Sequence, residues 1–126
     1  MKRYTDVPMK NEVKENIILK LTFEFSILII EFAEILESNR RFVIANQILK
    51  SGTSIGANVR EAQNAESKAD FIHKIKIAIK EVEETEYWLE LCHYSKNYPD
   101  TDELQSKLKS IKLILAKIIT TSKNKQ

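Results

Sequence analysis

The sequence predicts an all-α protein of one domain, built as an up-down-up-down antiparallel four-helix bundle. No segment of the 126 residues alternates polar and apolar side chains at period two, which argues against strands. Apolar residues instead recur at helical spacing over four long segments, and two glycines and two prolines leave few places for turns. Short connections between long helices make consecutive helices antiparallel. The predicted helices cover residues 10–37, 40–65, 68–94 and 101–121 of the domain 1–126.

The first predicted helix carries more apolar side chains than one bundle core requires. Residues 17–36 are apolar over a length that suggests a membrane span. Four charged residues nevertheless fall on one narrow stripe of this helix: Lys20, Glu24, Glu31 and Glu34. We therefore expect an amphipathic helix with a wide apolar face, and no membrane association. About three residues in seven suffice for one core, so the surplus predicts a second partner, most simply another copy of the chain.

The second predicted helix contains the most informative segment, SGTSIGANVREA at residues 51–62. Small and apolar residues step through this region at intervals of three and four and predict one continuous seam: Ala45, Ile48, Gly52, Ile55, Val59 and Ala62. Two glycines inside a helix cost about 2 kcal/mol relative to alanine, so we expect Gly52 and Gly56 to allow close approach of a neighbouring helix. Asn58 and Glu61 lie near this seam, where polar groups require partners, and are predicted to fix the register of the helices.

Capping residues and one turn mark the boundaries of the last two helices. Ser67 followed by Asp70 predicts an N-cap for the third helix, and Asp100 followed by Glu103 repeats this pattern before the fourth. The clearest turn in the chain is NYPD at residues 97–100. The predicted buried stripes are Phe71, Ile75, Ala78, Val82 and Leu89 in the third helix, and Leu104, Leu108, Ile111, Leu115 and Ile118 in the fourth.

No motif in the chain predicts catalysis or metal binding. Residues 52–56 (GTSIG) match the GxSxG pattern of serine hydrolases, but that motif needs a strand-to-helix turn, and helical periodicity runs through it here. The two histidines, His73 and His93, lie about 30 Å apart on one predicted helix and cannot share a metal. We therefore expect no enzymatic activity, no metal and no cofactor, with a hydrolase acting through Ser54 as the alternative.

Charged residues are segregated along the chain, although the net charge is only +2. Residues 81–90 contain five glutamates and no base, whereas the chain from Leu104 onward contains six lysines and no acid. Such segregation favours either charge matching between helices or a basic surface that binds a polyanion. The candidate phosphate contacts are Arg40, Arg41, Arg60, Lys74, Lys76 and Lys80. The single cysteine, Cys92, and a start without a signal-peptide pattern predict a cytoplasmic protein.

The segment from Ser51 to Cys92 resembles the 23S rRNA intervening-sequence protein family, a group of bacterial four-helix bundle proteins. The resemblance rests on SIGANVREA at residues 54–62, on an F-x-x-K-x-x-x-A element at residues 71–78 and on EYWL at residues 86–89. It implies a homo-oligomeric ring, a homopentamer, which would explain the surplus apolar surface of the first helix. A related branch, the accessory proteins of diversity-generating retroelements, forms a similar barrel that binds nucleic acid and a reverse transcriptase.

Two functions are therefore expected. The first is a non-enzymatic, cytoplasmic homo-oligomer that binds nucleic acid, RNA in particular, by neutralising phosphates, with a steep dependence on salt. The alternative is a scaffold whose ring docks a partner enzyme such as a reverse transcriptase. The alternative is motivated by the two-sided apolar character of the first helix and of the third, where Tyr87 and Trp88 stand beside Leu89 and Leu91.

Overall fold

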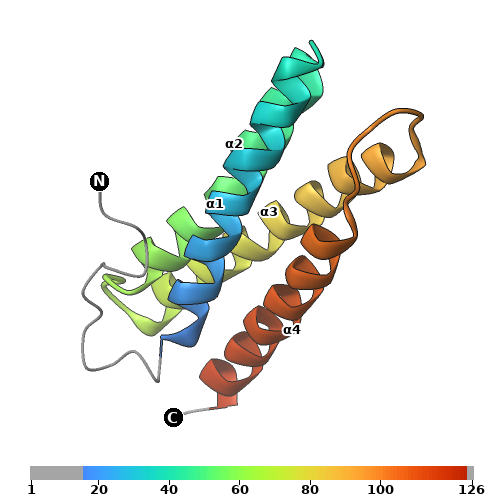
Figure 1. Ribbon diagram of the computed structural model, residues 1–126. Coiled ribbons are helices and arrows are strands. Elements are labelled where there is room, and N and C mark those ends of the chain that lie inside the picture. The colour runs from blue at the N-terminus through green and yellow to red at the C-terminus, as the bar shows by residue number, and fades with distance from the viewer. Residues whose placement is uncertain (1–15, 125–126) are drawn as a thin grey trace.

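A computed structural model describes residues 16–124, and this part of the chain contains four α-helices and no strand (Figure 1). The helices are α1 (Ile17–Ser38), α2 (Phe42–Ala62), α3 (Lys68–Tyr94) and α4 (Asp102–Asn124). The prediction of an all-α, four-helix protein is thereby confirmed. The bounds of α3 agree with the predicted range 68–94. Compared with the predicted ranges 40–65 and 101–121, α2 is shorter at both ends, and α4 begins one residue later and ends three residues later. Residues 10–15 of the first predicted helix lie outside the described residues.

The helices form an antiparallel bundle in which each helix packs against its neighbours in the chain, and α4 also packs against α1. Helices α1 and α3 therefore lie diagonally across the bundle. Figure 1 shows the start of α1, the α2–α3 turn and the end of α4 together at one end, here called the basal end. The opposite end, called the apical end, is formed by the α1–α2 turn and the α3–α4 loop, residues 39–41 and 95–101.

The predicted seam of α2 lies at the centre of the core. All six of its residues are buried, from Ala45 to Ala62. Side chains of α1, among them Phe25 and Ile29, pack against it and are themselves buried. The predicted stripes of α3 and α4 are also buried, except that Phe71 and Ile118 are only partly covered. The heptad-like spacing thus identified the core-facing side of three helices.

Helix α2 approaches α1 closely at its two glycines. A Cβ atom placed on Gly52 would lie 2.8 Å from both Cγ1 and Cγ2 of Ile29. At Gly56 it would lie 3.3 Å from the backbone carbonyl oxygen of Thr22 in α1. The first distance is shorter than real Cβ contacts, so the absence of a side chain at Gly52 sets the α1–α2 separation there.

A buried pair of hydroxyl groups links α2 to α3. The Thr85 and Ser51 oxygens are hydrogen-bonded at 2.9 Å, and Thr85 also bonds to the Glu81 carbonyl oxygen at 2.7 Å. Both residues are at most 1% exposed. Because each hydroxyl has a partner, the pair is accommodated in the core without an unsatisfied polar group.

The N-cap predicted for α3 is confirmed. The Ser67 hydroxyl accepts a hydrogen bond from the Asp70 backbone N–H at 3.0 Å. The Asp70 carboxylate in turn accepts from the Glu66 backbone N–H at 3.2 Å, which gives a reciprocal arrangement like a capping box. This end of α3 is therefore fixed by local hydrogen bonds before any tertiary contact is counted.

The cap predicted for α4 is wrong in position. Helix α4 begins at Asp102, so the residue that precedes it is Thr101 and not Asp100. Thr101 is buried and donates to the Gln105 side-chain oxygen at 2.9 Å. Asp100 accepts from the Asp102 backbone N–H at 3.3 Å, two residues on, and forms a local turn contact outside the helix.

Candidate nucleic-acid interface

The six basic residues predicted to contact phosphate do not form one surface. Arg40 and Arg41 lie at the apical end, in the turn that precedes α2, whereas Arg60 lies in the last turn of α2 at the basal end. The two groups are separated by most of the length of α2, about 30 Å. Only the residues around the α2–α3 turn and the first half of α3 can act together.

Arg41 joins the two connections at the apical end. Its guanidinium carbon lies 4.0 Å from the centroid of the Tyr98 ring, and Nη2 donates to the Asn97 carbonyl oxygen at 3.3 Å. Within residues 16–124 its buried Nε has no hydrogen-bond partner. The guanidinium therefore ties the α1–α2 turn to the α3–α4 loop by a cation–π contact. Nothing in the sequence indicated this pairing, because the two residues are 57 positions apart.

The other four basic residues gather around the basal half of α2 and α3. Lys76 and Lys80 are exposed and lie one turn apart on α3. Lys74 Nζ lies 3.3 Å from Glu61 Oε1, so part of its charge is neutralised by α2. The Arg60 guanidinium lies 5.8 Å from the centroid of Phe23 in α1. Arg60, Lys76 and Lys80 are thus exposed, whereas Lys74 is half-buried.

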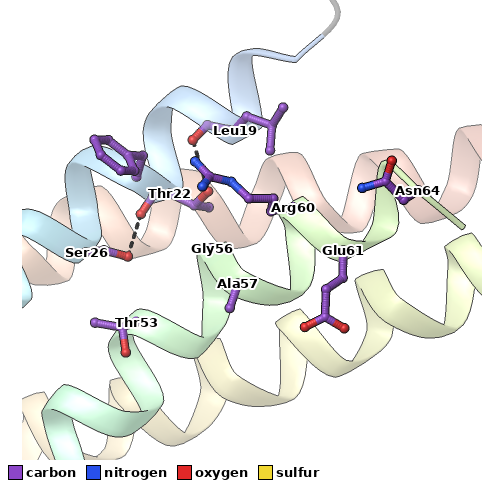
Figure 2. Close-up of a pocket in the computed structure, with 10 residues that line it drawn as sticks. Leu19, Thr22, Ser26, Thr53, Gly56, Ala57, Arg60, Glu61 and Asn64 are labelled. Carbon is purple, nitrogen blue, oxygen red and sulfur yellow. Dashed lines mark hydrogen bonds between the residues drawn. The ribbon is translucent and has the colours of Figure 1, made fainter. Parts of the chain in front are cut away.

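A shallow groove of about 430 Å³ runs between α1 and α2 beside Arg60 (Figure 2). Figure 2 shows the Arg60 guanidinium directed across it towards Leu19, with Asn64 beyond it in the turn that follows α2. The middle of the groove is lined by small residues, including Gly56, Ala57 and Ser26. The groove is thus a consequence of the close α1–α2 contact, with its one arginine at the basal end.

The two polar residues near the seam behave differently. The Asn58 side-chain amide donates to the Ser54 carbonyl oxygen at 2.8 Å, within its own helix. Glu61 instead reaches α3 through the ion pair with Lys74. Within the described residues, Glu61 is the one of the two whose side chain contacts a neighbouring helix, and its ion pair with Lys74 is partly exposed.

The GTSIG segment lies in the middle of α2 and contains no strand-to-helix turn. The Ser54 hydroxyl donates to the Lys50 carbonyl oxygen at 2.6 Å.

Burial raises the pKa of the Cys92 thiol to about 11, although Arg41 nearby acts in the opposite direction. In residues 16–124 no three His, Cys, Asp or Glu side chains are grouped as a metal ion would require. None of the described helices combines the length and hydropathy needed to cross a bilayer.

Comparison with known proteins gives the family. The model of the 23S rRNA-intervening sequence protein family matches residues 14–119. A similar solved structure is that of a protein of unknown function from the S23 ribosomal protein family of Bacteroides thetaiotaomicron. The two share 41% sequence identity with a TM-score of 0.77, over 81% of this chain and 97% of that chain. Among curated proteins, none matches. Because the family match reaches from before α1 into α4, the chain belongs to the 23S rRNA-intervening sequence protein family.

Proposed function

We propose that this chain is a cytoplasmic, non-enzymatic homo-oligomer that binds nucleic acid, with RNA as the first candidate. The observation that carries the proposal is the exposed pair Lys76 and Lys80, which lies in the same half of the bundle as Arg60 and Lys74. Lysine and arginine neutralise phosphates without reading bases, so binding through them is tolerant of sequence and sensitive to salt. The family name, which refers to 23S rRNA, favours RNA over DNA.

Self-association is supported by exposed apolar side chains on opposite sides of the bundle. Ile30 on α1 is 43% exposed, and Tyr87 and Leu91 on α3 are 56% and 41% exposed. Because α1 and α3 lie diagonally across the bundle, their outward faces point in opposite directions. A subunit with two different association faces joins its copies head to tail, and such an interface closes into a ring when the rotation allows it. The proposed assembly is such a ring, a homopentamer.

The nucleic-acid proposal is tested with Lys76→Gln/Lys80→Gln. Fluorescence anisotropy of a labelled RNA hairpin, titrated at several salt concentrations, gives the slope of log K against log salt. Removing two phosphate contacts should reduce the size of this slope by about two. Lys96→Gln/Lys109→Gln, which removes the same charge from exposed positions in the apical half, is the matched control and should leave the slope unchanged. Equal slopes for wild type and Lys76→Gln/Lys80→Gln would remove these lysines from the interface.

The oligomer is tested by sedimentation velocity. We expect the wild type to sediment as a complex of several chains, and Tyr87→Glu/Leu91→Glu to sediment as a smaller species, because a charge in an apolar interface is poorly solvated. A control variant, Lys117→Glu, changes charge at an exposed position away from these two side chains. A wild type that is monomeric at micromolar concentration would contradict the assembly.

A second candidate function, a scaffold for a partner enzyme such as a reverse transcriptase, is favoured by one further observation. Phe42 and Val43, in the first turn of α2, are 58% and 80% exposed. Adjacent exposed apolar residues of this size are typical of protein contacts. A partner captured by the wild type but lost with Phe42→Ser/Val43→Ser, while RNA binding is retained, would favour the scaffold.

A further inference from the structure

The bundle is electrically polar along its length. When each helix is divided at its middle, the basal half comprises residues 16–27, 53–80 and 114–124 and contains eight Lys and Arg against four Asp and Glu. The apical half, residues 28–52 and 81–113, contains seven Lys and Arg against eleven Asp and Glu. The described residues thus divide into halves of net charge +4 and −4. Because neighbouring helices are antiparallel, their dipoles largely cancel, and the side chains create this polarity.

Exposed apolar side chains are also unevenly distributed, and most of them lie in the apical half. Ten large apolar residues are exposed in the described part of the chain, and only Ile17 and Phe23 belong to the basal half. The eight in the apical half are Ile30, Ile35, Phe42, Val43, Tyr87, Leu91, Tyr94 and Leu113. The basal half is therefore basic with little apolar surface, and the apical half is acidic and rich in apolar surface.

The end of α4 adds two lysines to the basal half. Lys117 and Lys123 are both exposed. The ion pair between Lys112 and Glu86, at 3.0 Å, fixes the antiparallel register of α4 against α3. Lys76 lies ten residues before Glu86 on α3, and Lys123 lies eleven residues after Lys112 on α4. In antiparallel helices these two positions are therefore at about the same level of the bundle. Exposed lysines of α3 and α4 thus occur at the same level of the basal half.

We propose that the basal half is the polyanion-binding part of the molecule, and that Lys117 and Lys123 of α4 contact nucleic-acid phosphates together with Lys76 of α3. This assignment rests on the proposed nucleic-acid binding and adds where on the bundle, and in which orientation, the nucleic acid docks. The net negative charge of the apical half repels phosphates, so the nucleic acid approaches the basal half and leaves the apical apolar surface for protein contacts.

Nucleic acid fits this end better than a lipid surface does. Stable association with a membrane needs apolar side chains inserted beside the basic ones. Both exposed apolar residues of the basal half are on α1, whereas the lysines of this proposal are on α3 and α4. A surface of lysines without apolar neighbours is suited to a hydrated phosphate backbone.

The test compares two double variants of the same helix, Lys117→Gln/Lys123→Gln and Lys107→Gln/Lys109→Gln. All four lysines are exposed, and each variant loses the same charge, but the first pair is basal and the second apical. Anisotropy of a labelled RNA hairpin is measured over a range of salt concentrations. The basal variant should weaken binding and reduce the salt slope by about two, whereas the apical variant should bind as the wild type does.

The outcomes separate this inference from the function on which it rests. In the first outcome, the wild type binds RNA and the salt slope falls as much in the apical variant as in the basal one, or more. This result would refute the assignment of the binding surface to the basal half, while nucleic-acid binding itself would stand. If the wild type does not bind RNA at low salt, the function itself fails. Binding of phosphatidylglycerol vesicles but not RNA, lost in the basal variant, would overturn nucleic acid as the occupant. Thermal melting of both variants, expected to match the wild type, confirms that folding is unchanged.

Discussion

The contact between Gly52 and Ile29 yields a stability prediction whose sign can be worked out. In an exposed helix, alanine is more stable than glycine by about 1 kcal/mol. At Gly52 the added Cβ would lie 2.8 Å from both Cγ atoms of Ile29, which branch from the same carbon. Ile29 has 0% exposure and cannot rotate away into solvent. Because overpacking a core costs about 1–3 kcal/mol, which exceeds or equals the gain in helix propensity, we expect Gly52→Ala to lower the free energy of unfolding by up to about 2 kcal/mol.

Urea unfolding followed by far-ultraviolet circular dichroism measures this change. The protein concentration is held constant, because self-association adds to apparent stability. Ala57→Gly is the matched control: position 57 is exposed on the same helix, so it reports helix propensity alone, a loss of about 1 kcal/mol.

The same substitution in a variant with a truncated Ile29 side chain tests the contact more directly. Ile29→Ala removes both Cγ atoms that would collide, so Gly52→Ala should become stabilising in that background, by about 1 kcal/mol. The sign of the same substitution thus reverses with its neighbour, which is the behaviour of two residues in direct contact. If Gly52→Ala stabilised the otherwise wild-type protein, the close α1–α2 approach at this position would be refuted.

Three further predictions concern the core and the apical end. Thr85→Val should destabilise the fold by about 1–3 kcal/mol in urea unfolding, because Ser51 keeps a buried hydroxyl without its partner, and adding Ser51→Ala should recover part of the loss. Arg41→Gln should cost about 0.5–2 kcal/mol by loss of the contact with Tyr98, with the RNA salt slope unchanged; a changed slope would return Arg41 to the interface. Cys92, with its pKa raised to about 11, should react with iodoacetamide at pH 8 only after unfolding, and rapid labelling of the native protein would show that the thiol is accessible. The unfolded thiol has a pKa of about 8.5. The contribution of the buried neutral thiol to the stability of the fold is therefore fully present below that pH and is lost as the pH rises towards 11.

The fold was predictable because apolar spacing and composition agree over the whole described chain. The seam that contains Gly52 keeps its intervals of three and four past Gly56, and this unbroken periodicity is a stronger signal than the low helix propensity of glycine. Helix ends were less predictable. Thr101, buried before α4, displaced the predicted Asp100 cap, since burial and a side-chain bond to Gln105 are tertiary facts that a capping pattern does not contain.

The candidate site was predictable only in part. Lys76 and Lys80 lie four residues apart, so their common face follows from helix geometry alone. The separation of Arg41 from Arg60 also follows from helix geometry, because they lie at opposite ends of α2. The packing of Arg41 on Tyr98, in contrast, joins connections far apart in the sequence. The buried Ser51–Thr85 pair has one indication in the sequence: Thr85 occupies a stripe position between Val82 and Leu89 of α3.

Direct titration of a structured RNA with the wild-type protein tests the central claim, which is electrostatic binding of nucleic acid. Anisotropy is recorded at two salt concentrations with the same RNA. The account predicts tight binding at low salt that weakens steeply when the salt concentration is raised. Absence of binding at low salt would contradict it and would direct attention to the apolar apical surface and its protein partners.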